Sequence, residues 1–160
     1  MSIHQHPAFP GNGWLDEIGN KEGKGYTINV PLPPRSGDDL FIQSLLSFLP
    51  IIEQFKPDIT AISAGFDGHY ADPLLELNYT TSSFYEIGRI LSNNLTNIFA
   101  VLEGGYNIDY LPKCIYNFIA GVNQSKIPFK ETATISNDSV KQEGLKRIKA
   151  LKEILSDYWL

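Results

Sequence analysis

Two short apolar runs, each followed by a loop and a helix-like segment, constrain the fold of this chain more than any other feature. Residues 59–63 (ITAIS) and 98–102 (IFAVL) are β-branched and apolar, as is typical of buried strands. A capping box of Ser83 and Glu86 predicts the start of one helix, and residues 111–122 have the apolar spacing of another. Alternating strands and helices predict βαβ units with parallel strands. The predicted fold is an α/β parallel sheet with helices on both faces.

The remaining segments complete this predicted order of elements. Residues 26–30 alternate as a strand, and residues 39–55 have the apolar spacing of a helix. Residues 4–25 are rich in His, Pro and Gly, which predicts an irregular loop. Residues 123–138 are polar without periodicity and predict a linker, whereas residues 139–160 predict an amphipathic helix that packs on the domain or on a partner.

Composition excludes several classes of protein. The chain has 160 residues, of which 42% are apolar and 19% are charged, as expected of one globular domain. Its net charge of −5 has the wrong sign for direct binding of nucleic acid. No signal peptide or membrane span is recognisable. The single cysteine permits neither an internal disulfide nor a thiolate zinc cluster, so we expect a cytoplasmic protein.

Polar loops follow both apolar strands, which is where open parallel sheets bind their ligands. Asp67 lies in the loop after residues 59–63, and Tyr106 lies in the loop after residues 98–102. If these two strands are neighbours, both side chains face one crevice. Two glycines before Tyr106 allow the positive φ that would hold its hydroxyl over the sheet edge. The same sequence also fits a tight turn with an exposed aromatic ring.

Side chains of the types that bind metal ions are concentrated in three histidines and two aspartates. They are His4, His6, His69, Asp67 and Asp72. From the residues alone, His4 and His6 could join Asp67 as three zinc ligands with an open position for water. The alternative is that the two N-terminal histidines lie in a solvated loop and that Asp67 caps backbone amides in a turn.

An ordered set of short motifs resembles the histone deacetylase family, which includes the acetylpolyamine amidohydrolases. The resemblance covers residues 2 to about 122, and its Leu-Glu-Gly-Gly-Tyr form is similar to the class II and prokaryotic branch. The motifs are Ser-Ile-His-Gln at 2–5, Phe-Pro-Gly-Asn-Gly at 9–13, Asp-Glu-Ile-Gly at 16–19, Gly-Lys-Gly-Tyr at 23–26, Asn-Val-Pro-Leu-Pro at 29–33, Ser-Ala-Gly-Phe-Asp at 63–67, Asp-Pro-Leu at 72–74 and Leu-Glu-Gly-Gly-Tyr-Asn at 102–107.

This resemblance assigns roles to five residues. It implies an arginase/deacetylase-like fold and a zinc-dependent deacetylase that hydrolyses the amide of acetyl-lysine or an acetylated polyamine. Asp67 matches a zinc ligand, and Tyr106 matches the catalytic tyrosine that binds the developing oxyanion. Phe9 and Leu74 match walls of the substrate tunnel, and the Tyr26 carbonyl matches a potassium ligand. The N-terminal histidines do not match the family's zinc ligands.

The resemblance also predicts that the chain is an incomplete catalytic domain. The family's other two zinc ligands, in an Asp-x-His motif, and its His-His general base precede the matching residues. We therefore expect residues 1–122 to be the C-terminal half of a deacetylase-type domain, truncated on its N-terminal side, with one of three zinc ligands and no activity alone. Part of the sheet would be bare, which favours association with a missing N-terminal half or with a second copy. The competing hypotheses are a non-catalytic binding or assembly module and a flavodoxin-like binder of small ligands.

Overall fold

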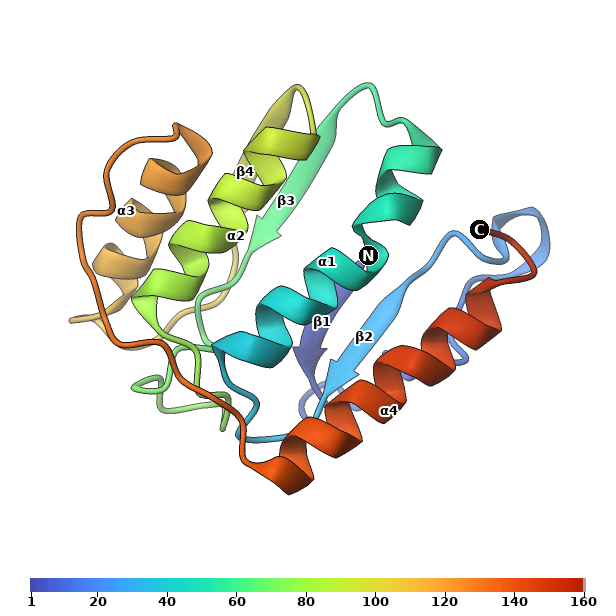
Figure 1. The fold of residues 1–160 in the computed structure, drawn as a ribbon, viewed down its shortest axis with the longest axis horizontal. Helices are drawn as coiled ribbons and strands as arrows, with labels where there is room; N and C mark the ends of the chain where they lie inside the picture. The colour runs from blue at the N-terminus through green and yellow to red at the C-terminus, as the bar shows by residue number, and fades with distance from the viewer. Residues whose placement is uncertain (160) are drawn as a thin grey trace.

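The computed structural model of the protein describes residues 1–159, in which parallel strands alternate with helices (Figure 1). In chain order the elements are β1 (Ser2–Gln5), the short 3-10 helix η1 (Lys21–Gly23), β2 (Asn29–Leu32), α1 (Asp38–Phe55), β3 (Thr60–Ala64), α2 (Thr81–Asn94), β4 (Ile98–Leu102), α3 (Leu111–Val122) and α4 (Asp138–Leu155).

The second pair of strands lies where the sequence predicts it. β3 is displaced by one residue from the predicted run, and β4 and α3 coincide with their predicted ranges. β3 and β4 pair in parallel, with Thr60 beside Ile98 and Ala64 beside Leu102. The predicted βαβ unit is therefore confirmed here, with α2 as the crossover helix.

The first pair of strands differs from the prediction. β1 runs into the segment 4–25 that the sequence predicts as a loop, and β2 begins at Asn29 and includes Pro31. His6 donates its backbone N–H to the carbonyl of Leu32 (2.8 Å), so alternation turns Pro31 away from β1. A proline is tolerated there because its missing N–H falls on an open edge of the sheet.

The predicted capping box of α2 is wrong. The helix begins at Thr81 with Thr80 as its N-cap, three residues earlier than a box with Ser83 as the N-cap requires. Ser83 donates its hydroxyl to the carbonyl of Thr80 (2.9 Å), and Glu86 pairs with Arg89 (2.8 Å) on the helix surface. The side chain of Thr80 makes no capping hydrogen bond, so the N-terminus of α2 needs an acceptor from elsewhere in the chain.

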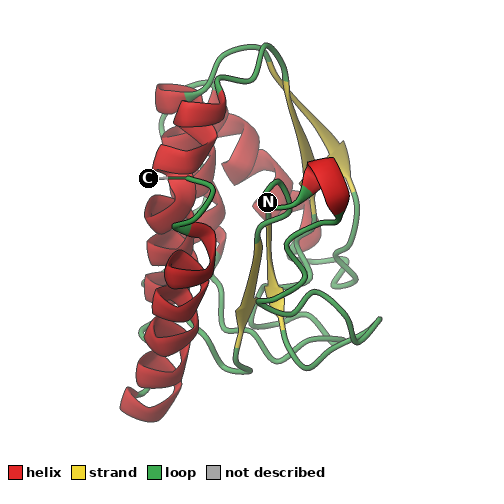
Figure 2. Ribbon diagram, turned by 90° about the vertical axis from the view of Figure 1, so that its right-hand side faces the viewer, coloured by secondary structure: helices red, strands yellow, loops and turns green. Residues whose placement is uncertain are grey.

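One face of the β3–β4 pair is bare. Figure 2 shows the helices gathered mainly on one side of the strands. The side chains of Phe99 and Val101 in β4 are each more than half exposed, and their neighbours on the same face, Ala61 and Ser63 of β3, are also exposed. Buried strands ordinarily have such side chains covered on both faces, so the expectation of helices on both faces is not met at this pair.

The core lies between the first strands and the helices that cover them. α4 packs against β2 and α1, so the predicted amphipathic helix covers the chain's own domain. Its buried residues Leu151 and Leu155 join Leu32, Leu40 and Phe48 among the most deeply buried side chains. Within residues 1–159, no helix has both the length and the apolar character needed to cross a membrane.

Helices α2 and α3 approach each other closely at two glycines. A Cβ atom added to Gly88 would lie 2.5 Å from the carbonyl oxygen of Phe118, and one added to Gly121 would collide with the carbonyl oxygen of Tyr85. Any side chain at either position would push the helices apart. The two helix backbones are therefore in direct contact.

The predicted linker has no regular secondary structure up to α4, yet it is bound along the body of the protein. The side-chain amide of Asn117 in α3 holds it at Phe129, accepting from the backbone N–H (3.0 Å) and donating to the carbonyl (2.7 Å). Farther along, the hydroxyl of Thr134 accepts from the backbone N–H of Asp38 at the start of α1 (3.0 Å). These contacts fix the path of the segment between α3 and α4.

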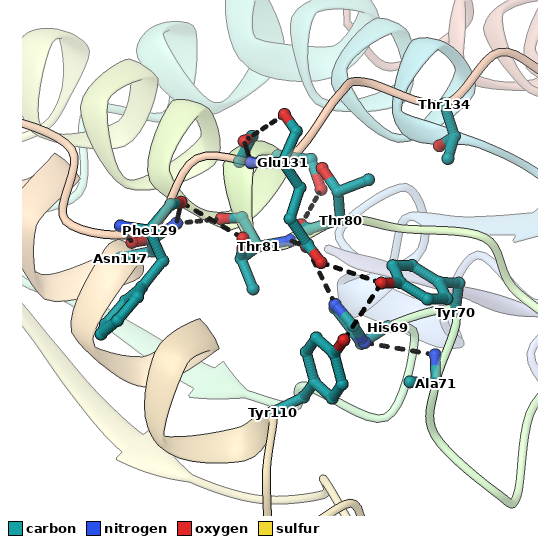
Figure 3. Close-up of polar contacts among 12 residues, drawn as sticks. His69, Tyr70, Ala71, Thr80, Thr81, Tyr110, Asn117, Phe129, Glu131 and Thr134 are labelled. Atoms are coloured by element: carbon teal, nitrogen blue, oxygen red, sulfur yellow. Dashed lines mark hydrogen bonds and ion pairs between the residues drawn. The ribbon is translucent and has the colours of Figure 1, made fainter.

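Glu131 is the central contact of this segment (Figure 3). One carboxylate oxygen accepts the backbone N–H of Thr81 (2.7 Å) and lies 3.1 Å from Nε2 of His69, and the other accepts the hydroxyl of Tyr70 (2.9 Å). Glu131 therefore supplies the acceptor that the first turn of α2 lacks. A carboxylate at this end of a helix also interacts favourably with the helix dipole.

The hydrogen bonds to Glu131 lower the pKa of its carboxyl by more than burial raises it. Burial alone would raise the pKa of this carboxyl, but the bonds from Thr81, His69 and Tyr70 lower it below its ordinary value of 4.5. A carboxylate whose pKa is lower in the folded state stabilises the fold above its unfolded pKa. That contribution is lost as the pH falls through the folded pKa.

We predict that Glu131→Ala lowers the free energy of unfolding by about 2–3 kcal/mol at neutral pH, because the buried His69 ring and the Thr81 N–H lose their acceptor. Urea denaturation measures this loss, and its size should shrink as the pH falls below 4.5. Glu153→Ala, at an exposed glutamate of α4, is the control and should change stability by less than about 0.5 kcal/mol. An equal effect of the two substitutions would contradict the role of Glu131.

Candidate functional site

The loops after β3 and β4 meet at one edge of the sheet. Because these strands are parallel neighbours, their carboxyl ends lie side by side, as the sequence predicts. The backbone continues the contact beyond the strands: Glu103 donates to Ala64 (3.0 Å), and Phe66 donates to Gly104 (2.9 Å). The loop of Asp67 and the loop of Tyr106 are thereby joined by backbone hydrogen bonds.

Asp67 lies against the glycines of both loops. A Cβ atom on Gly104 would lie 2.7 Å from one Asp67 carboxylate oxygen, and one on Gly65 would lie 3.2 Å from the other. Glycine at these positions makes the room that the carboxylate occupies. Burial, together with the charge of Asp72, raises the pKa of Asp67 above its ordinary range. A cation beside Asp67 would stabilise the ionised carboxylate, so the position suits a metal ligand.

Asp72 ties the loop of Tyr106 to the loop of Asp67. Its carboxylate is buried and accepts two backbone N–H groups, from Tyr106 (2.6 Å) and from Leu74 (3.0 Å). Asn107 adds a second connection by donating its side-chain amide to the carbonyl of Ala71 (2.7 Å). Asp72 is a metal-type ligand by residue type, but both of its carboxylate oxygens accept backbone N–H groups and so position the backbone instead.

Tyr106 stands at the surface of this edge. Its side chain is 55% exposed, and the Gly105 before it has φ of +132°, a conformation that side chains rarely adopt. A Cβ on Gly105 would also lie 2.6 Å from Leu111 of α3. Gly104, unlike Gly105, does not have a positive φ and is needed only for space. One of the two glycines therefore has the backbone role that the sequence predicts.

A cavity of about 350 Å³ lies beside Asp67, between β1 and the loop after β3. Phe9 lines it, although its side chain is 99% exposed. Leu74 and Tyr106 are not among the lining residues within 1–159, and Leu74 is 64% exposed. Tyr26 lies away from this edge, with its ring packed edge-on against Trp159 (5.2 Å between centroids). The structure thus brings together Asp67 and Phe9 in a cavity, and Asp67 and Tyr106 through their loops.

The prediction that His4, His6 and Asp67 form a zinc site is wrong. The ring of His4 bonds Gly13 (3.0 Å) and Ser2 (2.9 Å), and the ring of His6 packs on Trp14 (4.7 Å between centroids). Their ring contacts hold the N-terminal loop. Among residues 1–159 no group of three His, Cys, Asp or Glu side chains could hold a metal ion.

The chain does contain one Asp-x-His tripeptide, Asp67-Gly68-His69, but it lies within the matching residues rather than before them. The His69 ring is buried, and both of its nitrogens have partners: Nε2 contacts Glu131, and Nδ1 accepts the N–H of Ala71 (3.2 Å). His69 therefore holds the loop in place and cannot act as a metal ligand beside Asp67.

The parallel sheet and the polar loops beyond its carboxyl ends define an α/β protein of the kind that binds ligands at that edge. Residues 1–122 match the histone deacetylase domain, and the chain belongs to this family. The resemblance that the sequence motifs carry is thereby confirmed.

Individual relatives agree with the family. A "Probable deacetylase" of Archaeoglobus fulgidus is 33% identical over 99% of this chain and 48% of its own length. The acetoin utilization protein AcuC of Staphylococcus aureus is 43% identical over 67% of this chain and 30% of its own. The solved HD domain of HDA15 superimposes with a TM-score of 0.83 at 28% identity, over 98% of this chain and 44% of that one. The chain spans about half the length, or less, of these proteins.

Glu131 and Asp72 hold the site together, and neither of these roles was predicted from the sequence. Glu131 lies in a polar stretch without periodicity, and its three partners come from a loop and a helix start 50 and more residues away. Nothing local distinguishes it from a solvated glutamate. Asp72 had a usable signal, because an Asp before a proline and a leucine commonly accepts the backbone N–H two residues on.

We predict that Asp72→Ala lowers the free energy of unfolding by about 2–3 kcal/mol and speeds hydrogen exchange at the Tyr106 amide, because two backbone N–H groups lose their acceptor. Urea denaturation and NMR-detected exchange measure the two effects. The control is Asp109→Ala, at an exposed carboxylate within the Tyr106 loop. Unchanged exchange at Tyr106 in the Asp72 variant would contradict the positioning role.

Proposed function

We propose that this chain is the part of a zinc-dependent deacylase domain that carries one metal ligand and the transition-state donor. The substrate class is an amide of an acetylated lysine or an acetylated polyamine. The observation that supports it is the joining of the Asp67 and Tyr106 loops at adjacent strand ends, in a member of the histone deacetylase family. Both assignments follow from the positions of these residues in the family's motifs.

The described residues do not form a zinc site by themselves. Asp67 provides one carboxylate, and among residues 1–159 it belongs to no group of three His, Cys, Asp or Glu side chains that could hold a metal ion. Within a complete domain, Asp67 would be one of three protein ligands. Zinc bound there would supply a water whose pKa is lowered to about 7. The raised pKa of Asp67 and the glycines around it fit this partial role.

The chain's own contribution to the chemistry is the placement of a donor. An amide carbonyl gains negative charge as water adds to it, and a fixed hydroxyl directed at that oxygen stabilises the transition state. Asp72 fixes the backbone of Tyr106, and Gly105 supplies the turn that precedes it. The Tyr106 hydroxyl would serve as this donor, with Asp72 as its positioning residue.

The other family assignments belong to the same proposal. Phe9 and Leu74 would be walls of the tunnel that admits an uncharged acylated side chain, and their exposure here leaves them free to meet further walls. A potassium ion at the Tyr26 carbonyl, a cytoplasmic location and the absence of direct contact with nucleic acid stay predictions. The net charge of −5 would favour cationic substrates.

We predict that the 160-residue chain alone binds less than one zinc per molecule and does not hydrolyse an acetyl-lysine peptide, because it holds one ligand and no general base. Zinc analysis by mass spectrometry and a deacetylation assay test this. Steady turnover by the chain alone would contradict the proposed division of the site. If the chain binds a partner specifically and no completed domain hydrolyses the peptide, the hypothesis of a non-catalytic binding module is favoured.

In a domain completed with the unmatched part of the Archaeoglobus fulgidus relative, we predict that Tyr106→Phe lowers kcat about a hundred- to a thousandfold and leaves the zinc content unchanged. Asp67→Ala should instead remove zinc. Tyr116→Phe, at an exposed tyrosine of α3, is the matched control and should leave both quantities unchanged. Loss of zinc in the Tyr106 variant would show that Tyr106 has been assigned the wrong role.

A further inference from the structure

We propose that Glu131 is a positioning residue for the candidate site, because it holds the loop of Asp67 and the loop of Tyr106 to each other. It does so through the Glu131 cluster, which comprises the side chains of Glu131, His69, Tyr70 and Tyr110. The effect on catalysis rests on the proposed function, whereas the coupling of the two loops rests on the contacts of the cluster.

The Glu131 cluster joins three segments that are distant in the sequence. His69 and Tyr70 belong to the loop after β3, and Tyr110 ends the loop after β4. Glu131 comes from the segment between α3 and α4, and Figure 3 shows its carboxylate directed at His69 and Tyr70. The His69 ring lies against both tyrosines, 4.4 Å from the Tyr70 centroid and 4.5 Å from the Tyr110 centroid. This buried ring is therefore a common contact of the two loops.

The partners of the His69 ring determine where its proton lies. Nδ1 accepts the backbone N–H of Ala71 (3.2 Å), so this nitrogen carries no proton. The neutral imidazole then has its proton on Nε2, which is 3.1 Å from Glu131. Although burial opposes it, the hydrogen bonds to Glu131 lower the pKa of its carboxyl, which is ionised at neutral pH and accepts this N–H. Glu131 thereby holds the imidazole in one tautomer and one orientation.

The second oxygen of Glu131 extends the connection to the Tyr106 loop. Tyr70 donates its one hydroxyl proton to this oxygen (2.9 Å), because a carboxylate only accepts. The hydroxyl oxygens of Tyr70 and Tyr110 lie 3.3 Å apart, so Tyr110 is the donor between them. Hydrogen bonds therefore run in one direction, from Tyr110 through Tyr70 to Glu131.

His69 closes the turn that carries Asp67. The backbone N–H of His69 donates to the carbonyl of Phe66 (3.2 Å), and the carbonyl of His69 accepts the N–H of Asp72 (2.8 Å). Asp67 lies inside this turn, between Phe66 and His69. Fixing the His69 ring therefore fixes the far end of the turn.

Tyr110 closes the loop of Tyr106 in a similar way. The carbonyl of Asn107, the residue after Tyr106, accepts the N–H groups of Tyr110 (3.2 Å) and Leu111 (2.8 Å). The N–H of Tyr106 itself is bonded to Asp72 of the other loop (2.6 Å). Asp72 thus holds the middle of this loop, and the Glu131 cluster holds its end.

A second anchor of the same segment provides a matched control. The Ser136 hydroxyl accepts the backbone N–H of Gly37 (2.9 Å) and donates to Asp39 (2.7 Å) at the start of α1. Among residues 1–159 its side chain bonds these two residues and neither loop of the candidate site. Ser136→Ala therefore loosens the segment without changing the Glu131 cluster.

NMR on the 160-residue chain tests the proton arrangement and the coupling. Long-range 1H–15N spectra at neutral pH should show the His69 proton on Nε2, with the signal assigned by its loss in His69→Gln. In Glu131→Ala, the amides of Asp72 and Leu111, which close the two loops, should exchange at least about tenfold faster relative to amides of α4. A proton on Nδ1 of His69, or unchanged relative exchange of these amides, would overturn the inference.

Two further variants separate this coupling from a general loss of stability. Ser136→Ala should change the relative exchange of the same amides less than about twofold. Tyr110→Leu leaves the contact of Glu131 with α2 in place, and should speed exchange at Asp72, in the other loop, at least about threefold. Equal effects of Glu131→Ala and Ser136→Ala would contradict the coupling.

Activity tests the positioning role in the domain completed with the unmatched part of the Archaeoglobus fulgidus relative. Glu131→Ala should lower kcat about ten- to a hundredfold and change KM less than about threefold. Glu131→Gln keeps an acceptor for His69 and Thr81, so its kcat should stay within about threefold of the unchanged domain. Ser136→Ala should change kcat less than about twofold.

The two failures are distinguishable. An active domain in which Glu131→Ala leaves kcat unchanged would overturn the positioning role of Glu131. A completed domain without any activity would instead contradict the proposed function, and the exchange experiment on the chain alone would then decide whether Glu131 couples the loops.

Discussion

The buried carboxylate of Asp72 is the contact on which the candidate site depends. It accepts backbone N–H groups from Leu74 in its own loop and from Tyr106 in the next, so one side chain determines how two loops lie together. Glu131 holds the same loop through His69 and Tyr70. The order of the site is thus maintained by acceptors that take no part in the proposed chemistry.

The fold was predictable where the signal is local and strong. β4 and α3 coincide with their predicted ranges because a bounded apolar run and a helical period need no distant partner. The start of α2 was not predictable, because its acceptor is Glu131 rather than Ser83 or another residue of its first turn. β1 was missed because four residues beside a His-rich loop carry too short a pattern, and only pairing with β2 makes them a strand.

The candidate site, like the fold, was predictable only where the sequence signal is local and strong. That Asp67 and Tyr106 lie at one edge follows from the rule for parallel strands, once the two apolar runs are recognised as neighbours. That His4 and His6 hold a loop could not be read from residue type, because a histidine ring bonds a carbonyl oxygen as readily as it binds a metal. The resemblance predicts that part of the sheet is bare, but the division of the strands into the pairs β1–β2 and β3–β4 depends on distant pairing and could not be predicted from the sequence.

The glycine contact between α2 and α3 gives the candidate site a mechanical property. The Asp67 loop runs from β3 to α2, and the Tyr106 loop runs from β4 to α3. The strands are bonded to each other at one end, and the helix backbones touch at Gly88 and Gly121 at the other. Each loop is therefore one side of a closed frame. The two sides cannot slide past one another unless strands or helices separate, so the fold itself sets the spacing of the Asp67 and Tyr106 loops.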